Sequence, residues 1–152
     1  VKVNGTPVSG SVKTDKGYWM IQRSWQSGDT VSCEMEMEPE RVYAHPMVRA
    51  DAGCVALRRG PIIYTFEGVD NGEDLQTLRI PREAKIEALP YQADLLEGIV
   101  ALRVTGCRKK AAVNPALYAE DAAPEEMVTL QAIPYYAWCN RGMTHMRVWM
   151  QE

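Results

Sequence analysis

The chain has 152 residues, of which 46% are hydrophobic and 24% are charged, a composition typical of a folded globular protein rather than a disordered one. Its formal net charge of −3 comes from 17 basic and 20 acidic side chains mixed along the sequence, which argues against a nucleic-acid partner because no basic face is available for phosphates. No apolar run approaches the roughly 20 residues that a spanning helix needs, so no membrane partner is expected.

The first residues are expected to lie inside a fold rather than at its beginning. Residues 1–5 read as the end of a strand that runs into a turn, and the first residue is not methionine. We therefore expect a piece of a longer, water-soluble protein, whose signal peptide or catalytic domain could lie upstream. The compartment is left open between the cytoplasm and the periplasm.

Two strands and a domain boundary are predicted near the start of the chain. Residues 18–25 are rich in side chains that suit a pleated surface, and a turn follows at residues 27–29. Residues 30–38 alternate apolar side chains with Ser and Glu, a period of two typical of a strand. Because proline cannot donate to a ladder, we expect pairing to stop at Pro39 and place a domain boundary near residue 40.

The middle of the chain predicts short extended segments separated by turns. These segments cover residues 41–44, 47–50, 54–59, 62–66 and 75–80. Pro46 bends the chain between the first two, because proline disfavours helical geometry in the residue before it. Residues 84–89 could form another strand or a single turn.

The remaining residues complete an all-β pattern. A short helix is plausible only over residues 91–97, and a long polar loop is expected over residues 111–126. Strands are predicted over residues 99–105, 127–133 and 145–150. About nine short strands without helix-strand alternation predict an antiparallel β-sandwich, jelly-roll-like, with little helix.

Cysteine and histidine do not form a recognisable catalytic or metal motif. The cysteines, with no CxxC pair among them, are Cys33, Cys54, Cys107 and Cys139. We expect four buried free thiols, with two disulfides as the alternative if the protein is exported. His45 and His145 stand far apart, so we expect partly exposed strand residues; a small enzyme that uses both rings is the rival hypothesis.

Two acidic regions are candidates for chemistry. Asp70, Asn71, Glu73 and Asp74 offer the oxygen ligands that Ca²⁺ prefers, but their spacing is incomplete, so a solvated turn is the preferred interpretation and a calcium site the alternative. A glycosidase carboxyl pair could be sought among Glu34, Glu36, Glu38 and Glu40. Alternation places the first three along one solvated strand face instead.

Aromatic side chains are the remaining signal. Tyr135, Tyr136 and Trp138, with Tyr18, Trp19 and Trp25, could stack on sugar rings or anchor an interface. Packing in the core or between domains is the preferred interpretation, and carbohydrate binding is the alternative.

An ordered string of motifs carries a family resemblance. It runs through Gly17-Tyr18, His45-Pro46, residues 55–61 (VALRRGP), residues 67–71 (EGVDN) and residues 134–142 (PYYAWCNRG). With these motifs in this order, the chain resembles the C-terminal end of β-L-arabinofuranosidases of glycoside hydrolase family 127. The resemblance is weakest between about residues 82 and 126.

The resemblance implies a long enzyme with a helical catalytic barrel, a zinc-bound cysteine nucleophile and a catalytic glutamate, followed by two β-sandwiches. Residues 1–40 then look like the last strands of the middle sandwich, and residues 41–152 like the C-terminal one. None of the family's nucleophile, acid/base or zinc-ligand motifs has a matching position, so no catalytic residue or cofactor is expected here.

We therefore expect a non-catalytic module that packs against the upstream barrel of the same polypeptide or mediates a homodimer. The alternative is a carbohydrate-binding module that uses exposed aromatic residues. The residues expected to contact a partner or a sugar are Tyr135, Tyr136, Trp138, Asn140 and Arg141.

Overall fold

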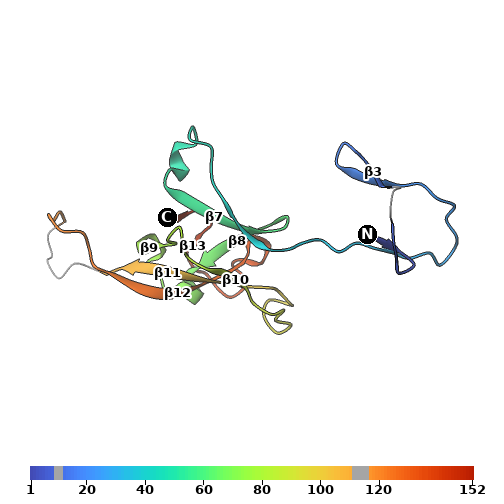
Figure 1. Cartoon of the computed structure of the whole chain (residues 1–152). Coiled ribbons are helices and arrows are strands. Elements are labelled where there is room, and N and C mark those ends of the chain that lie inside the picture. Colours follow the sequence, from blue (N-terminus) through green and yellow to red (C-terminus); the bar gives the residue numbers. More distant parts are fainter. Residues whose placement is uncertain (9–11, 111–116) are drawn as a thin grey trace. The chain divides into compact units, whose positions relative to one another are not determined.

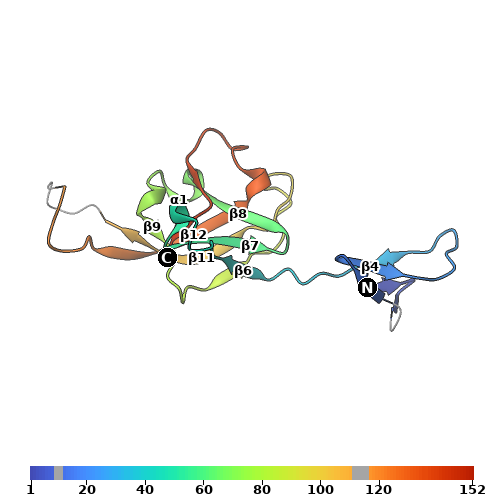
Figure 2. The same ribbon diagram turned by 90° about the horizontal axis from the view of Figure 1, so that it is seen from above.

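The computed structural model describes residues 1–8, 12–110 and 117–152 and is mostly β-strand with little helix (Figures 1 and 2). The all-β prediction is confirmed, whereas the jelly-roll arrangement stays a prediction. Contacts divide the chain into two units, Val1–Glu36 and Met37–Glu152. No helix among the described residues is long and apolar enough to cross a lipid bilayer.

Unit 1 consists of two small sheets with very short strands. One sheet has the order β2-β1-β5, formed by β1 (Lys2–Val3), β2 (Thr6–Pro7) and β5 (Val31–Ser32). The other is a hairpin of β3 (Val12–Asp15) and β4 (Tyr18–Ile21), connected through Lys16 and Gly17 at φ +50° and +84°. Positive φ at both central residues matches the right-handed twist of a two-residue hairpin.

The strand predicted over residues 30–38 is wrong beyond Ser32. β5 ends there because β1, its partner, pairs with only Val31 and Ser32. Met35, on the predicted apolar face, is 69% exposed. Pro39 does not end a strand but begins β6 (Pro39–Val42), a first position where a strand tolerates a missing backbone donor.

Unit 2 contains the longer strands and all of the helical turns. Its strands are β6, β7 (Cys54–Arg59), β8 (Ile62–Glu67), β9 (Leu78–Arg79), β10 (Ile86–Ala88), β11 (Leu102–Lys109), β12 (Glu125–Pro134), β13 (Met146–Arg147) and β14 (Met150–Gln151). The helical elements are η1 (Arg49–Asp51), α1 (Gly68–Asn71), η2 (Leu75–Thr77) and η3 (Tyr135–Ala137). The longest pairing joins β11 to β12, from Leu102 opposite Ala132 to Lys109 opposite Glu125.

Six strands of unit 2 form a closed circuit. β8 pairs with β12, β12 with β11, β11 with β9, β9 with β14, β14 with β7, and β7 again with β8. All of these pairs are antiparallel except β14 with β9. β6 adds to β7, β13 to β8 and β10 to β11. The circuit leaves its six strands with few unpaired edges.

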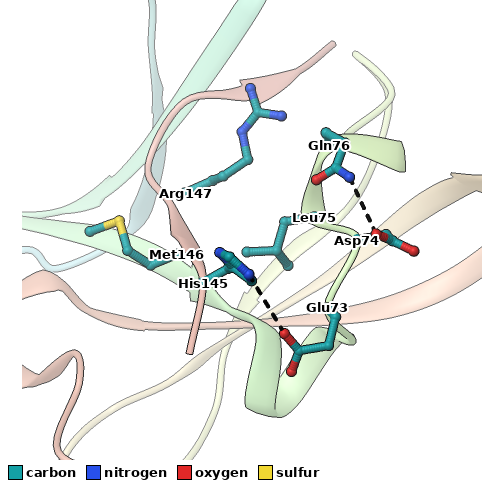
Figure 3. A pocket seen from close by; sticks show the side chains of 7 residues that line it. All are labelled: Glu73, Asp74, Leu75, Gln76, His145, Met146 and Arg147. Atoms are coloured by element: carbon teal, nitrogen blue, oxygen red, sulfur yellow. Dashed lines mark hydrogen bonds and ion pairs between the residues drawn. The ribbon is translucent and has the colours of Figure 1, made fainter. Parts of the chain in front are cut away.

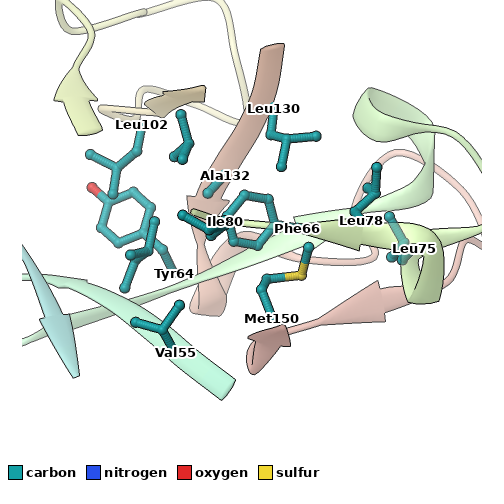
Figure 4. Close-up of a cluster of buried hydrophobic side chains, with 12 residues drawn as sticks. Val55, Tyr64, Phe66, Leu75, Leu78, Ile80, Leu102, Leu130, Ala132 and Met150 are labelled. Carbon is teal, nitrogen blue, oxygen red and sulfur yellow. The ribbon is translucent and has the colours of Figure 1, made fainter. Parts of the chain in front are cut away.

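The main core is built by all six strands of this circuit. Its buried residues, most of them labelled in Figure 4, are Val55, Leu57, Tyr64, Phe66, Leu75, Leu78, Ile80, Leu102, Val104, Leu130, Ala132 and Met150. Removing each large apolar side chain from water contributes about 1.5–3 kcal/mol. A second, smaller cluster forms from Ile99, Ala101, Ile133 and Ala137.

Three further predictions differ from the structure. Residues 91–97 form turns closed by a bridge between Gln92 and Ile99, not a helix. The α-helix is instead α1, whose last two residues, Asp70 and Asn71, belong to the expected acidic turn, and Gly72 at φ +85° ends it. Of the predicted loop, residues 111–116 lie outside the described residues, and β12 begins at Glu125 rather than residue 127.

The four cysteines are free thiols, but their burial differs from the prediction. Cys107 is buried and Cys54 half-buried, whereas Cys33 and Cys139 are exposed. Cys33 belongs to the strand predicted over residues 30–38, but β5 ends at Ser32 and Cys33 is exposed. Cys139 follows η3 in a left-handed turn at φ +64°.

Candidate functional site

The candidate segment, residues 135–142, follows β12 and presents two tyrosine rings to solvent. Tyr135 is 45% exposed and Tyr136 66% exposed, whereas Trp138 is half-buried. Ala137 is buried in the second apolar cluster, which fixes the turn to the body of unit 2. Asn140 turns back on its own segment, since its amide nitrogen donates to the Ala137 carbonyl at 3.1 Å.

A network of two carboxylates, those of Glu67 and Asp70, also holds this segment. Arg141 Nη1 donates to Asp70 Oδ1 at 2.8 Å, and its Nη2 lies 2.5 Å from both Asp70 Oδ2 and Glu67 Oε2. The Glu67 side chain is fully buried, and its Oε1 accepts the Cys139 backbone N–H at 2.7 Å. These contacts, with the Asp70 hydrogen bond the strongest influence, raise the pKa of Arg141 above its ordinary value, against the effect of burial.

Arg141 therefore differs in role from the two exposed tyrosines. Its guanidinium binds two carboxylates of its own unit, which anchors the turn rather than presenting a charge outward. Sequence reasoning missed Glu67 as a functional residue. The signal was present, because an acidic residue at the end of the apolar strand Ile62–Glu67 is rarely buried unless it is paired.

The four calcium-ligand candidates have separate partners. Asp70 binds Arg141, while Asn71, at the end of α1, uses its amide to bind the backbone of Glu67 and Gln131. Glu73 lies 4.0 Å from His145, and Asp74 accepts from the Gln76 amide at 3.3 Å. Within the described residues, no group of three or more His, Cys, Asp or Glu side chains could hold a metal ion. Calcium binding by this turn stays a prediction.

A surface pocket of about 410 Å³ lies beside this turn (Figure 3). Its lining residues are Glu73, Asp74, Leu75, Gln76, His145, Met146 and Arg147. The His145 ring is 79% exposed, and Glu73, its neighbour, is 74% exposed, so solvent screens the pair. His45 lines a different pocket with Tyr43 and Glu152, and its Nδ1 accepts the Met47 backbone N–H. The two histidines thus have different surroundings.

The chain is similar to known glycoside hydrolases. The chain is 36% identical to a non-reducing end beta-L-arabinofuranosidase from Bifidobacterium longum over 99% of its length, which is 23% of that protein. It matches the crystal structure of a GH127 beta-L-arabinofuranosidase from Geobacillus stearothermophilus T6 with a TM-score of 0.85 and 46% identity, covering 99% of this chain and 24% of that one. A second solved structure, a GH127 beta-arabinofuranosidase, gives a TM-score of 0.82 and 32% identity, with 99% and 22% covered.

These values mean that the chain spans about a quarter of the length of the relatives it matches. Residues 39–151 match the model of the glycoside hydrolase family 127 C-terminal domain. Because that match includes nearly all of unit 2, the chain belongs to the family of glycoside hydrolase family 127 C-terminal domains.

Proposed function

We propose that this chain is the non-catalytic C-terminal part of a longer glycoside hydrolase of the β-L-arabinofuranosidase type. In this proposal, unit 2 packs against the catalytic domain or against a second subunit. The names of the matched relatives support the activity of the longer polypeptide, and their length supports a catalytic part beyond residues 1–152.

The pairing of the buried carboxylates supports a non-catalytic role. Glycoside hydrolysis uses two carboxyl groups that flank a sugar, one of which must exchange a proton during the reaction. Glu67 is buried and, like Asp70, is bound to Arg141, so these carboxylate oxygens contact a side chain of their own unit. The barrel, nucleophile and zinc implied by the family resemblance are assigned by this proposal to the polypeptide outside this chain.

One observation carries the packing role: an internally anchored turn presents Tyr135 and Tyr136 to the outside. Tyrosine supplies a large contact area at low entropic cost, which is why it is enriched in interfaces. The buried contacts of Ala137 and Arg141, which both follow the two tyrosines in the chain, hold the backbone of this turn, so little further ordering is needed when a partner binds.

The test compares one double variant in two contexts, the isolated chain and the full-length polypeptide. Tyr135→Ser with Tyr136→Ser should leave the melting temperature of the isolated chain nearly unchanged, because both rings are exposed there. In the full-length polypeptide, the same variant should lower the melting temperature and expose residues 37–152 to protease. Tyr118→Ser, at a residue that is 91% exposed, is the matched control and should act weakly in both contexts.

Equal effects of the double variant in both contexts would contradict the packing role. If the effect is selective for the full-length polypeptide, sedimentation velocity of the double variant distinguishes a second subunit from the catalytic domain as the partner. Loss of a subunit contact halves the mass, whereas loss of a contact with the catalytic domain does not. Cleavage of an aryl β-L-arabinofuranoside by the isolated chain above the buffer rate would contradict the non-catalytic role.

Carbohydrate binding is the second candidate, favoured by the same two adjacent exposed rings. Aromatic faces stack on sugar rings, and both tyrosines are accessible in the isolated chain. This function predicts a saturable change in intrinsic fluorescence with arabinose-containing oligosaccharides that the double variant abolishes. A flat titration at millimolar sugar would count against it.

A further inference from the structure

Two consecutive arginines at the end of β7 have unequal surroundings. Arg58 points outward, and its side chain binds the Glu40 carboxylate on β6 at 2.7 Å. Arg59 follows the inner face of the strand, since side chains alternate and the buried Val55 and Leu57 share its parity. Arg59 thus lies at the rim of the main core, while Arg58 lies on the solvated surface.

Arg59 has no carboxylate partner in the part of the chain that the structure describes. Its Nε is buried there and donates no hydrogen bond. A buried donor without a partner costs about 1–3 kcal/mol, and more when the group is charged. Among the described residues of unit 2, nothing offsets the loss of stability that the unpartnered Nε of Arg59 causes.

Two other arginines share the buried Nε but have partners for the rest of the guanidinium. Arg141 binds Glu67 and Asp70, and Arg108 Nη2 donates to the Asn71 carbonyl at 2.5 Å. Arg59, like Arg108, forms no ion pair among the described residues, but in that part of the chain its guanidinium also donates to no carboxylate or backbone carbonyl. Its charge is therefore available for a group from outside.

Two tyrosines lie beside Arg59. Tyr64 on β8 is buried, and its hydroxyl donates to the Val100 carbonyl at 2.8 Å. Arg59 pairs with Ile62, and Tyr64 lies two residues further along β8 on the same face. Burial raises the pKa of Tyr64, the positive charge of Arg59 and a side-chain hydrogen bond with it oppose that increase, and Tyr136 adds to it. The register agrees, because Pro134 pairs with Tyr64 and η3 begins at the next residue. We call Arg59, Tyr64 and Tyr136 the Arg59 patch.

We propose that the Arg59 patch receives an aspartate or glutamate carboxylate from the part of the longer polypeptide outside residues 1–152. The guanidinium fork matches a carboxylate with two parallel hydrogen bonds, and the exposed Tyr136 ring would cover the pair from water. A neutral sugar could accept hydrogen bonds from Arg59 but would leave its charge unpaired. The inference rests on the proposed packing role and adds the chemistry of the partner and the place where it docks.

The test uses the full-length polypeptide with p-benzoylphenylalanine in place of Tyr136. Ultraviolet light should crosslink this probe to a segment outside residues 1–152 that contains Asp or Glu, identified by mass spectrometry. Arg59→Met, which keeps the apolar stem, should reduce the crosslink yield by roughly tenfold or more, since truncating one partner of a buried charge pair weakens a contact strongly. Arg58→Met is the matched control and should leave the yield unchanged.

Two further variants keep the test decisive. Arg59→Lys retains the charge without the fork and should give an intermediate yield, which a variant that merely unfolds would not. Arg59→Glu alone should remove the crosslink. A second substitution that replaces the acidic residue identified in the partner segment by Arg should restore the crosslink yield, because the two charges are then exchanged.

The inference is overturned if the probe crosslinks only within residues 1–152, if the partner segment has no carboxylate, or if both methionine variants give the wild-type yield. Each of these results would leave the packing role standing provided that Tyr135→Ser with Tyr136→Ser still destabilises only the full-length polypeptide. Loss of that selective effect would instead remove the packing role itself.

Discussion

Unit 1 and unit 2 are built from similar strand-forming sequences, yet among the residues that the structure describes only unit 2 forms a hydrophobic core. In unit 1 the strands have two to four residues, and Trp19 and Trp25 are about half exposed. In unit 2, six strands close on one another around twelve buried residues. The difference teaches that an apolar strand is stabilised by neighbouring strands that pair with it and by side chains that bury its apolar face. Unit 2 contains both.

The largest effect should come from emptying the core of unit 2. Phe66 is fully buried in the closed circuit, so Phe66→Ala should lower the free energy of unfolding of unit 2 by about 3–5 kcal/mol. Trp19→Ala in unit 1, where the ring is 55% exposed, should change stability by only about 0.5 kcal/mol. Urea denaturation of both variants measures the two changes in the free energy of unfolding. Equal decreases would mean that the packing of Trp19 in unit 1 contributes as much to stability as that of Phe66 in unit 2.

The next largest effect should come from the buried ion network. Arg141→Ala leaves the Glu67 carboxylate buried without its cation, which should cost about 3 kcal/mol. Arg58→Ala breaks a pair whose side chains are about half exposed and should cost about 0–1 kcal/mol. Thermal unfolding of the two variants at neutral pH compares them. Similar melting temperatures would show that the pair of Glu67 and Arg141 does not anchor the tyrosine turn.

A smaller effect should appear in the pH dependence of unit 2. The Glu152 carboxylate accepts from Tyr43 and binds Arg82 and Arg41, and these contacts lower its pKa from 4.5. A lowered folded-state pKa stabilises the fold above pH 4.5, and this contribution is lost as the pH falls through the folded-state value.

Glu152→Gln should therefore be less stable than the unsubstituted protein at pH 7, and the difference should vanish well below pH 4.5. Glu83→Gln, at an exposed neighbouring position, is the control and should run parallel to the unsubstituted protein. Melting curves between pH 7 and 3 provide the measurement. A difference that persists at the lowest pH would assign the effect to lost hydrogen bonds rather than to charge.

The candidate site could be predicted only in part. Residues 135–142 were identifiable from their aromatic content, and the exposed Tyr135 and Tyr136 suit the predicted contact role. Arg141 lies in the same segment and belongs to the predicted contact residues for that reason. Its internal partners, Glu67 and Asp70, lie 74 and 71 residues earlier, and no local pattern connects residues that far apart.

The all-β class, the places of most turns and the family resemblance were determined by the sequence alone, because alternation, proline and glycine act on local backbone geometry. Tertiary structure alone decided that residues 33–38 are not a strand, that unit 2 closes on itself, and that Arg58 is paired while Arg59 is not. A period of two specifies which face each side chain takes, but a strand also needs a neighbour to accept its hydrogen bonds, and a buried charge needs a counterion. Both partners come from distant parts of the chain, so only the folded arrangement specifies them.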